Sequence, residues 1–166
     1  RLDRGIFLEV CMEIKQGYSY HIKEIFFTEM QNSSFMSNKE NGHYRPHYYA
    51  IEDQNNCGIF WMIPISSKAE KYKQIINAKI EKYGKCSTIV IGKFAGNDNV
   101  FLIQNAFPIK SIYLDHIHTI KGLPITIHKK LEKELRNKLR EVLALKKRGI
   151  NLFYTDVDKI LEAITK

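Results

Sequence analysis

Cysteine is scarce in this sequence. Its three residues, Cys11, Cys57 and Cys86, form neither a C-x-x-C pair nor an even set for disulfides. A reducing cytoplasm is the simplest interpretation of so few, widely spaced thiols. No apolar run approaches the ~20 residues that a membrane-spanning helix needs, and the run at residues 5–8 is too brief for a secretory signal. We therefore expect a cytoplasmic protein that does not enter a membrane.

Several catalytic motifs are also missing. The chain has no P-loop, no G-x-G-x-x-G after a strand, no nucleophile elbow and no H-E-x-x-H. These absences argue against nucleotide-dependent, redox and zinc-protease chemistry. His116 and His118, with Asp115, are the one set of side chains that could bind a metal. No other Cys, His or Asp cluster supports it, so we favour a hydrogen-bonded pair and expect neither a metal nor another cofactor.

Positive charge and aromatic rings are plentiful. The 166 residues carry 26 Lys and Arg against 18 Asp and Glu, a net charge of +8, with 9 Tyr and 9 Phe. This charge favours a polyanionic partner, either nucleic acid or an acidic membrane face, and exposed rings can stack on unpaired bases. The length and a hydrophobic content of 44% suit a single domain over residues 1–166. Met12 is a candidate natural start.

A β-hairpin is the clearest local prediction. Residues 47–51 and 58–65 have strand composition, and residues 53–57 between them have turn chemistry. An antiparallel pairing would bring Arg45 and His47, at one open end, beside Ser66 and Ser67 at the other. The polar residues 31–42 before it are expected to form a long flexible loop.

Other elements follow from periodicity and caps. Residues 18–27 suit a strand followed by a short helix, and residues 128–148 have the longest helical pattern, whose apolar stripe includes Leu131, Leu135 and Leu139. Thr155 is predicted to cap a last short helix. The remaining expected elements are helix 68–83, with Gly84 at its end, and strands 87–91 and 100–103.

The junction between the second hairpin strand and helix 68–83 is the candidate site. Ser67 and Glu70 have the S-x-x-E spacing of a capping box, which predicts Ser67 as the N-cap. A helix N-terminus with Ser66, Ser67 and Lys68 at its mouth suits a phosphate. Capping alone is an ordinary structural role for such a serine, so the spacing by itself leaves both interpretations open.

RNA cleavage without a metal fits these residues. The substrate supplies its 2′-hydroxyl as nucleophile, and the protein must orient it, neutralise charge and move protons. Arg45 and Lys68 can supply charge, Ser66 and Ser67 can donate hydrogen bonds, and His47 or His43 can move a proton. For either histidine alone, a packed or loop role is the simpler interpretation. Our other candidate RNA contacts are Tyr20, Lys23, Tyr44, Lys71, Lys79 and Lys82, although a solvated face explains most lysines.

The chain resembles the ToxN/AbiQ toxins of type III toxin–antitoxin systems, nearest to the CptN-like branch. The most specific parts are Pro-Ile-Ser-Ser-Lys at 64–68 and Leu-Ile-Gln-Asn-Ala-Phe-Pro at 102–108. Residues 20–23, 45–49, 60–63, 70–72, 101 and 118–122 also match, whereas residues 1–17 lie outside the resemblance. Position by position, the family's serine falls on Ser67 or Ser66 and its lysine on Lys68. Its basic position falls on His47, with Arg45 beside it.

The resemblance implies an α+β fold: a compact, partly open antiparallel β-barrel of the Kid/MazF type with packed helices. It also implies a sequence-selective, metal-independent endoribonuclease that leaves 2′,3′-cyclic phosphate and 5′-hydroxyl ends. The implied inhibitor is a small RNA pseudoknot, which the toxin cuts from a precursor and binds in a closed ring. This chain lacks a proline that spaces serine and lysine in the ToxN branch, so Lys68 and Lys71 both stay open as the phosphate ligand.

Two other classes of function compete with this hypothesis. A non-catalytic RNA- or DNA-binding module would use the same basic surface without a cleavage site. An interaction protein would instead use its basic helices to bind an acidic protein. Cleavage of single-stranded RNA in EDTA separates the first alternative from a nuclease, and only the nuclease depends on Ser67.

Overall fold

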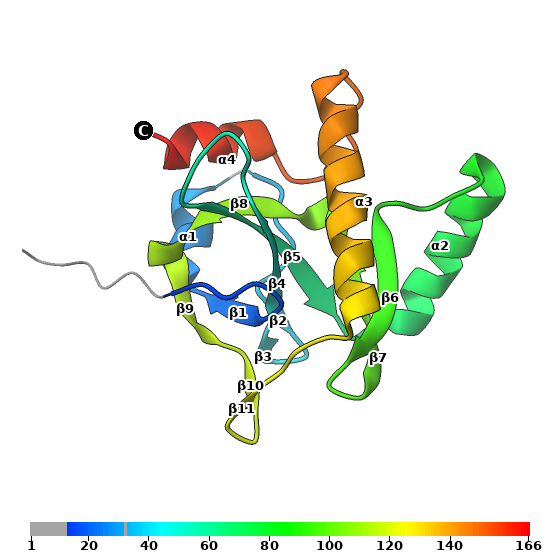
Figure 1. Cartoon of the computed structure of the whole chain (residues 1–166), viewed down its shortest axis with the longest axis horizontal. Coiled ribbons are helices and arrows are strands. Elements are labelled where there is room, and N and C mark those ends of the chain that lie inside the picture. Colours follow the sequence, from blue (N-terminus) through cyan, green and yellow to red (C-terminus); the bar gives the residue numbers. More distant parts are fainter. Residues whose placement is uncertain (1–12, 32) are drawn as a thin grey trace, which may run out of the picture.

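An antiparallel sheet built around the predicted hairpin is the centre of the fold. The computed structural model describes residues 13–31 and 33–166, so Cys11 and the candidate start Met12 lie outside the described residues. Strands β4 (His47–Glu52) and β5 (Ile59–Ser66) pair antiparallel, with His47 opposite Pro64, which confirms the hairpin. The described residues combine antiparallel strands with four α-helices, which is an α+β fold (Figure 1).

Strand β5 connects the two halves of the sheet. The strand order is β6-β7-β5-β4-β1-β9, and β8 also pairs with β5. Residues at the start of β5 pair with β8, whereas Ile65 and Ser66 at its end pair with β7. The other strands are β1 (Ser19–Ile22), β6 (Ile89–Phe94), β7 (Asn97–Leu102), β8 (Phe107–Lys110) and β9 (Leu114–Ile117).

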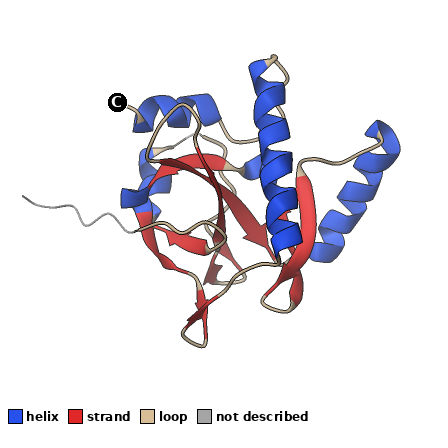
Figure 2. Cartoon of the chain, in the orientation of Figure 1, coloured by secondary structure: helices blue, strands red, loops and turns tan. Residues whose placement is uncertain are grey.

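The sheet curves strongly without closing (Figure 2). Within the described residues, no backbone pairing joins its outer strands, β6 and β9. Side chains bridge the gap instead: the rings of Phe94, at the end of β6, and His118, just after β9, stack with centroids 5.6 Å apart. The antiparallel α+β expectation is therefore confirmed, whereas the partly open barrel stays a prediction.

Alternation along β5 divides the core between the two faces of the sheet. Ile63 packs with Tyr48, Phe101 and the apolar stripe of a long helix. Its neighbour Met62 points to the other face and packs with Phe107 in a second cluster. A third, smaller cluster lies around Val100, Leu102 and Ala69.

The helices largely follow the predicted patterns. Helix α3 (Lys129–Lys147) buries Leu131, Leu135, Leu139 and Val142, which confirms its apolar stripe. Gly84 ends α2 (Ala69–Tyr83) with a φ of 81°, as predicted, but Tyr83 is 67% exposed, so the apolar face of α2 is only partly buried. The other helices are α1 (Glu24–Glu29), α4 (Val157–Ile164) and the 3-10 turns η1 (Ile103–Asn105) and η2 (Ser111–Tyr113). Every helix in the described part of the chain is too short or too polar to span a bilayer.

Two capping predictions are wrong. The N-cap of α4 is Asp156, whose carboxylate accepts from the backbone N–H of Lys159 at 3.2 Å. Thr155 instead donates to the carbonyl of Ala106, 49 residues away, at 2.6 Å. Helix α2 begins after Lys68 and has no side-chain cap, because Ser67 bonds elsewhere.

The polar segment before β4 is more ordered than the predicted loop. It ends in a small hairpin of β2 (Lys39–Glu40) and β3 (His43–Tyr44). Asn41 and Gly42 form its turn with φ values of 52° and 80°, as the two-residue hairpin turn requires. This hairpin lies against the start of β4. A second short pair, β10 (Thr119–Ile120) and β11 (Leu123–Pro124), follows β9.

Candidate active site

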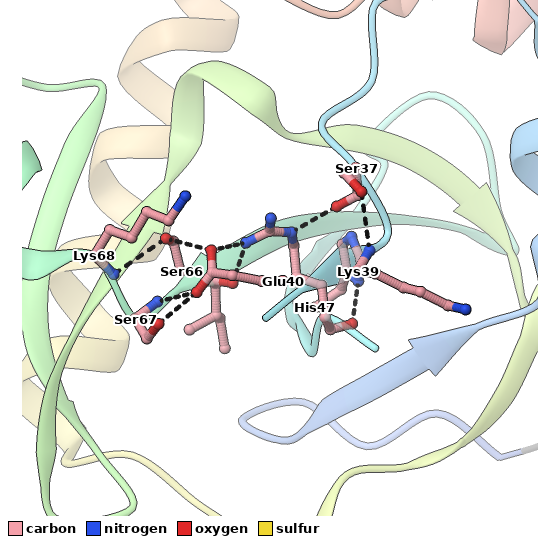
Figure 3. Close-up of polar contacts among 9 residues, drawn as sticks. Ser37, Lys39, Glu40, His47, Ser66, Ser67 and Lys68 are labelled. Carbon is pink, nitrogen blue, oxygen red and sulfur yellow. Dashed lines mark hydrogen bonds and ion pairs between the residues drawn. The ribbon is translucent and has the colours of Figure 1, made fainter. Parts of the chain in front are cut away.

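The open end of the β4–β5 hairpin brings together three of the predicted groups. Arg45 lies just before β4 and donates from Nη1 to the carbonyl of Ile65 at 2.9 Å. Ser66 ends β5, and Ser67 follows it. Figure 3 shows that the hydroxyls of both serines converge on the carboxylate of Glu40, a residue that the sequence analysis did not select, and Arg45 also donates to it.

Glu40 accepts four hydrogen bonds. Its Oε2 accepts from Arg45 Nη1 at 2.9 Å and from Ser66 Oγ at 2.7 Å. Its Oε1 accepts from the backbone N–H of Ser67 at 2.7 Å and from Ser67 Oγ at 2.5 Å. Both carboxylate oxygens are thus held by two donors each. The site binds an oxyanion that the chain itself supplies.

Charge at this site is strongly stabilised. Burial by itself would raise the pKa of Glu40, but hydrogen bonds from Ser67, Ser66 and Arg45 lower it to about 2. Arg45 is only 4% exposed, and its Nε donates to the carbonyl of Ser37 at 2.9 Å. A buried guanidinium of this kind depends on its carboxylate partner. The ionised pair therefore persists at neutral pH.

Ser66 and Ser67 differ in accessibility. Ser66 is buried, and its Oγ also accepts from the backbone N–H of Lys68 at 3.2 Å. Ser67 is exposed, as is the side chain of Lys68. A bound nucleotide can reach Ser67 and Lys68 directly, whereas Ser66 and Arg45 lie beneath them and hold Glu40.

His47 lies near the site but does not face solvent. It is 2% exposed, and its ring packs against Phe107 with centroids 5.5 Å apart. Burial and the charge of Arg45 lower the pKa of His47 to about 3. A neutral, enclosed imidazole is poorly placed for the predicted proton transfer.

His43 is the more accessible histidine. It is exposed on β3 and lies directly opposite Glu40 in the β2–β3 register. Cross-strand partners on one face are in side-chain contact distance. The neighbouring Tyr44 is also exposed, and Lys39 Nζ lies 4.7 Å from its ring centroid. His43 therefore shares the face of Glu40, whereas Lys39 and Tyr44 lie on the opposite face of the hairpin, and Figure 3 shows Lys39 pointing away from the serines.

The remaining predicted RNA contacts fall into two groups. Lys71 and Lys82 are exposed on α2, with their ammonium groups over the rings of Tyr72 and Tyr83. Lys23 is exposed too, although its Nζ donates to the carbonyl of Ile112 at 2.9 Å.

Tyr20 and Lys79 have structural partners. Tyr20 is 1% exposed in the core, and its hydroxyl accepts from the backbone N–H of Lys15, so its side chain is not accessible to RNA. Lys79 Nζ donates to Thr88 Oγ1 at 3.1 Å and to Gln104 Oε1 at 3.3 Å. These bonds tie α2 to the sheet.

The alternating histidines meet a third one. His21 Nε2 and His118 Nδ1 are 2.8 Å apart, and the rings of His21 and His116 stack at 4.6 Å. The favoured hydrogen bond between His116 and His118 is therefore not formed, because His118 bonds His21 of β1 instead. Within residues 13–31 and 33–166, no group of three or more His, Cys, Asp or Glu is arranged to hold a metal ion.

Glu40 is the functional candidate that sequence reasoning missed. It lies 26 residues before Ser66, in a segment interpreted as a loop. The Asn41-Gly42 dipeptide was the available signal, because it is the strongest short-range hairpin indicator. It would have placed Glu40 and His43 as partners, although not against the serines.

No protein-family model and no curated protein matches the chain. The functional argument therefore depends on the geometry of the site and on the motifs in the sequence.

Proposed function

We propose that this protein is a metal-independent endoribonuclease, the toxin of a type III toxin–antitoxin system. The observation that carries the proposal is the convergence of Arg45, Ser66 and Ser67 on one carboxylate at the end of β5. Donors that hold a carboxylate in this way can also hold phosphate oxygens, since both are oxyanions with matching hydrogen-bond requirements. The substrate is cellular or phage mRNA.

Ser67 is the group assigned to the scissile phosphate. Its backbone N–H and hydroxyl both point at the oxyanion position, and it is exposed. When phosphate binds, a non-bridging oxygen displaces the carboxylate of Glu40 from these two donors, and the ammonium of Lys68 neutralises the developing charge. Preorganised donors of this type stabilise a transition state without a cost of reorganising solvent. Ser66 and Arg45 act as positioning residues.

The reaction is an internal transesterification. The ribose 2′-oxygen forms a bond to phosphorus, and the bond from phosphorus to the 5′-oxygen of the next nucleotide breaks. The 2′-hydroxyl loses its proton, and the leaving 5′-oxygen gains one. The products are a 2′,3′-cyclic phosphate and a 5′-hydroxyl end. We assign proton transfer to His43, because it is exposed beside Glu40, whereas His47 is enclosed.

The proposed fold type and partners come from the resemblance to the ToxN/AbiQ toxins. The curved, unclosed antiparallel sheet supports a partly open barrel of the Kid/MazF type. The net charge of +8 and the exposed Lys71 and Lys82 on α2 favour an RNA partner. We propose that this partner is a small pseudoknot antitoxin, cut from its precursor and bound in a toxin–RNA assembly in the cytoplasm.

Cleavage of RNA in EDTA tests the proposal. Purified protein is incubated with mixed-sequence single-stranded RNA, and the ends are mapped chemically. We expect cyclic phosphate and 5′-hydroxyl ends, and a loss of about 10²-fold or more in Ser67→Ala, the magnitude of removing one oxyanion donor. Ser111→Ala, a serine away from the site, is the matched control. Unchanged cleavage by Ser67→Ala, or cleavage that needs a metal, would contradict the proposal.

A non-catalytic nucleic-acid-binding module is the second candidate. One observation favours it: Glu40 already satisfies the donors that a phosphate would need. In that case the protein would bind RNA through its basic surface and leave it uncut. Recovery of intact RNA from a stable complex, under conditions that permit turnover, identifies this function.

A further inference from the structure

Three histidine rings pack together beside the outer strand β9, apart from the hydrogen bonds around Glu40. His21 comes from β1, His116 from β9, and His118 follows β9. The rings of His21 and His116 lie with centroids 4.6 Å apart and 19° between their planes, and His21 Nε2 is 2.8 Å from His118 Nδ1. Phe94 continues the row by stacking on His118. The nuclease proposal makes no use of these rings.

The outer ring of this row has an accessible face. His21 covers one face of the His116 ring, and 61% of the His116 side chain is exposed. No other aromatic ring in the described part of the chain stacks on it. The ring behind it is held in place, because His21 is hydrogen-bonded to His118. An exposed aromatic face on a fixed support is preorganised for a planar ligand.

A β-bulge places Asp115 beside the same ring. His21 pairs with His116, but the next residue of β1 pairs two positions earlier on β9. Asp115 is therefore the extra residue of the bulge, and bulges re-aim side chains next to functional sites. Its Oδ2 is 3.4 Å from His116 Nδ1, and its side chain is 59% exposed. The carboxylate can accept from a donor on the edge of a ring that stacks on His116.

The charges of the cluster favour a base over a phosphate. Burial lowers the pKa of His21 to about 4, with His118 and His116 adding to the effect, and burial also lowers the pKa of His118. His21 and His118 are therefore neutral at pH 7. The carboxylate of Asp115 adds negative charge, which repels a phosphate. An unpaired nucleobase matches these surroundings, because it is neutral and planar and because bases stack on histidine rings.

The strand register brings the cluster close to the serines. Strands β1, β4 and β5 are adjacent, and their pairing puts His21 level with Ile65, whose N–H donates to the carbonyl of Pro46 between them. Adjacent strands lie ~4.8 Å apart, so two strands separate these residues by about 10 Å. Ser67 follows Ile65 by two residues. Because phosphates in a stacked strand are ~3.4 Å apart, a base on His116 belongs to a nucleotide a few positions from the one held at Ser67.

We propose that the exposed face of His116 binds an unpaired base of the RNA substrate. The base stacks on the imidazole, and Asp115 accepts from a donor on the edge of the base. His21, His118 and Phe94 are positioning residues that support the ring. This subsite rests on the proposed function, because its ligand is the RNA that the protein cuts, but binding can be measured without cleavage.

Uncleavable RNA tests the subsite separately from catalysis. A mixed-sequence RNA hexamer with 2′-O-methyl groups has no nucleophile, so it can be bound but not cut. The histidine ring signals are followed by NMR as the hexamer is added, and an abasic hexamer of equal charge is the control ligand. We expect a saturable upfield shift of the His116 signal with the base-bearing hexamer and little shift with the abasic one.

Substitutions at residue 116 test the stacking itself. His116→Ala should weaken binding of the base-bearing hexamer about tenfold, within the range for one stacked base, whereas His116→Phe should keep most of the affinity because it keeps an aromatic face. Leu123→Ala is the matched control, since Leu123 is 69% exposed on β11, which follows the cluster in the chain, but lies outside the row of rings.

The outcomes for the subsite and for the nuclease are distinct. Equal affinities in His116→Ala and Leu123→Ala, or no shift of the His116 signal with the base-bearing hexamer, would overturn the inference even if the protein cuts RNA. Stacking on His116 in a protein that leaves unmodified RNA intact would support the binding surface and contradict only the proposed cleavage.

Discussion

Replacing Glu40 by glutamine removes one charge from the candidate site and keeps its shape. In the native protein the pKa of Glu40 lies at about 2, against 4.5 ordinarily, because the serines and Arg45 hold the ionised form. At 1.36 kcal/mol per pKa unit, this difference favours the folded carboxylate by ~3.4 kcal/mol. Since the folded pKa is lowered, this stabilisation is present above pH 4.5 and is lost as the pH falls towards 2.

The variant should be less stable by about 3 kcal/mol at pH 7. The glutamine oxygen can still accept from Ser67, but Arg45 keeps a buried charge without a counterion, which costs roughly 3–5 kcal/mol in other proteins. Urea unfolding at pH 7 and pH 3 measures the effect, and the gap between the two proteins should narrow at the lower pH. Glu81→Gln, an exposed position on α2, is the control. A Glu40→Gln protein within 0.5 kcal/mol of wild type at pH 7 would refute the reasoning.

The same variant tests whether the serine donors accept an external anion. Without the carboxylate, Ser67 and Arg45 face a neutral amide, so inorganic phosphate can replace the lost charge. We expect phosphate to raise the Tm of Glu40→Gln more than that of wild type, with sodium chloride matching the ionic strength. Equal shifts in the two proteins would show that the donors are committed to residue 40 alone.

Two further predictions concern stability. Because burial and Arg45 lower the pKa of His47 to about 3, the unfolded chain binds a proton below pH 6.5 that the folded protein does not. His47 should therefore lower the free energy of unfolding by ~2 kcal/mol between pH 7.5 and pH 5. The lowered pKa of His21, about 4, acts in the same range, so His47→Gln should reduce the pH dependence in urea titrations by the share of His47 without abolishing it. An unchanged slope counts against the buried neutral ring. Asp156→Ala should cost ~1 kcal/mol by removing the N-cap of α4, and Asp156→Asn should restore most of it. Equal losses of stability in the two variants would show that Asp156 does not stabilise α4 as its N-cap.

Patterns within one element predicted that element well. The alternation and turn residues of the hairpin placed β4 and β5, and the stripe through Leu135 and Leu139 placed α3, because these signals are local and repeated. The predicted hairpin was also sufficient to place Arg45 beside Ser66 and Ser67. Local spacing failed at Ser67, where a capping box with Glu70 was expected, since the carboxylate of Glu40 competes for the same hydroxyl.

Contacts between segments that are distant in the sequence could not be predicted from local patterns. Glu40 contacts Ser67 across 27 residues, and His21 contacts His118 across 97 residues. The sequence spacing of these residues predicts neither contact, because both contacts depend on how several strands pair. The burial of His47 could not be predicted either, since its ring packs against Phe107 on a strand that is distant in the sequence.

The three-way pairing of β5 limits how this protein can change in length. A deletion of one residue between Gly58 and Ser66 would shift every later side chain to the opposite face of the strand. Ser66 would then take the place of Ile65 in the apolar interior, and Ser67 would take the place of Ser66 beside the carboxylate. Insertions and deletions should therefore be tolerated at the surface turn of β10 and β11 and excluded from β5, which makes strand length itself a constraint on the chemistry.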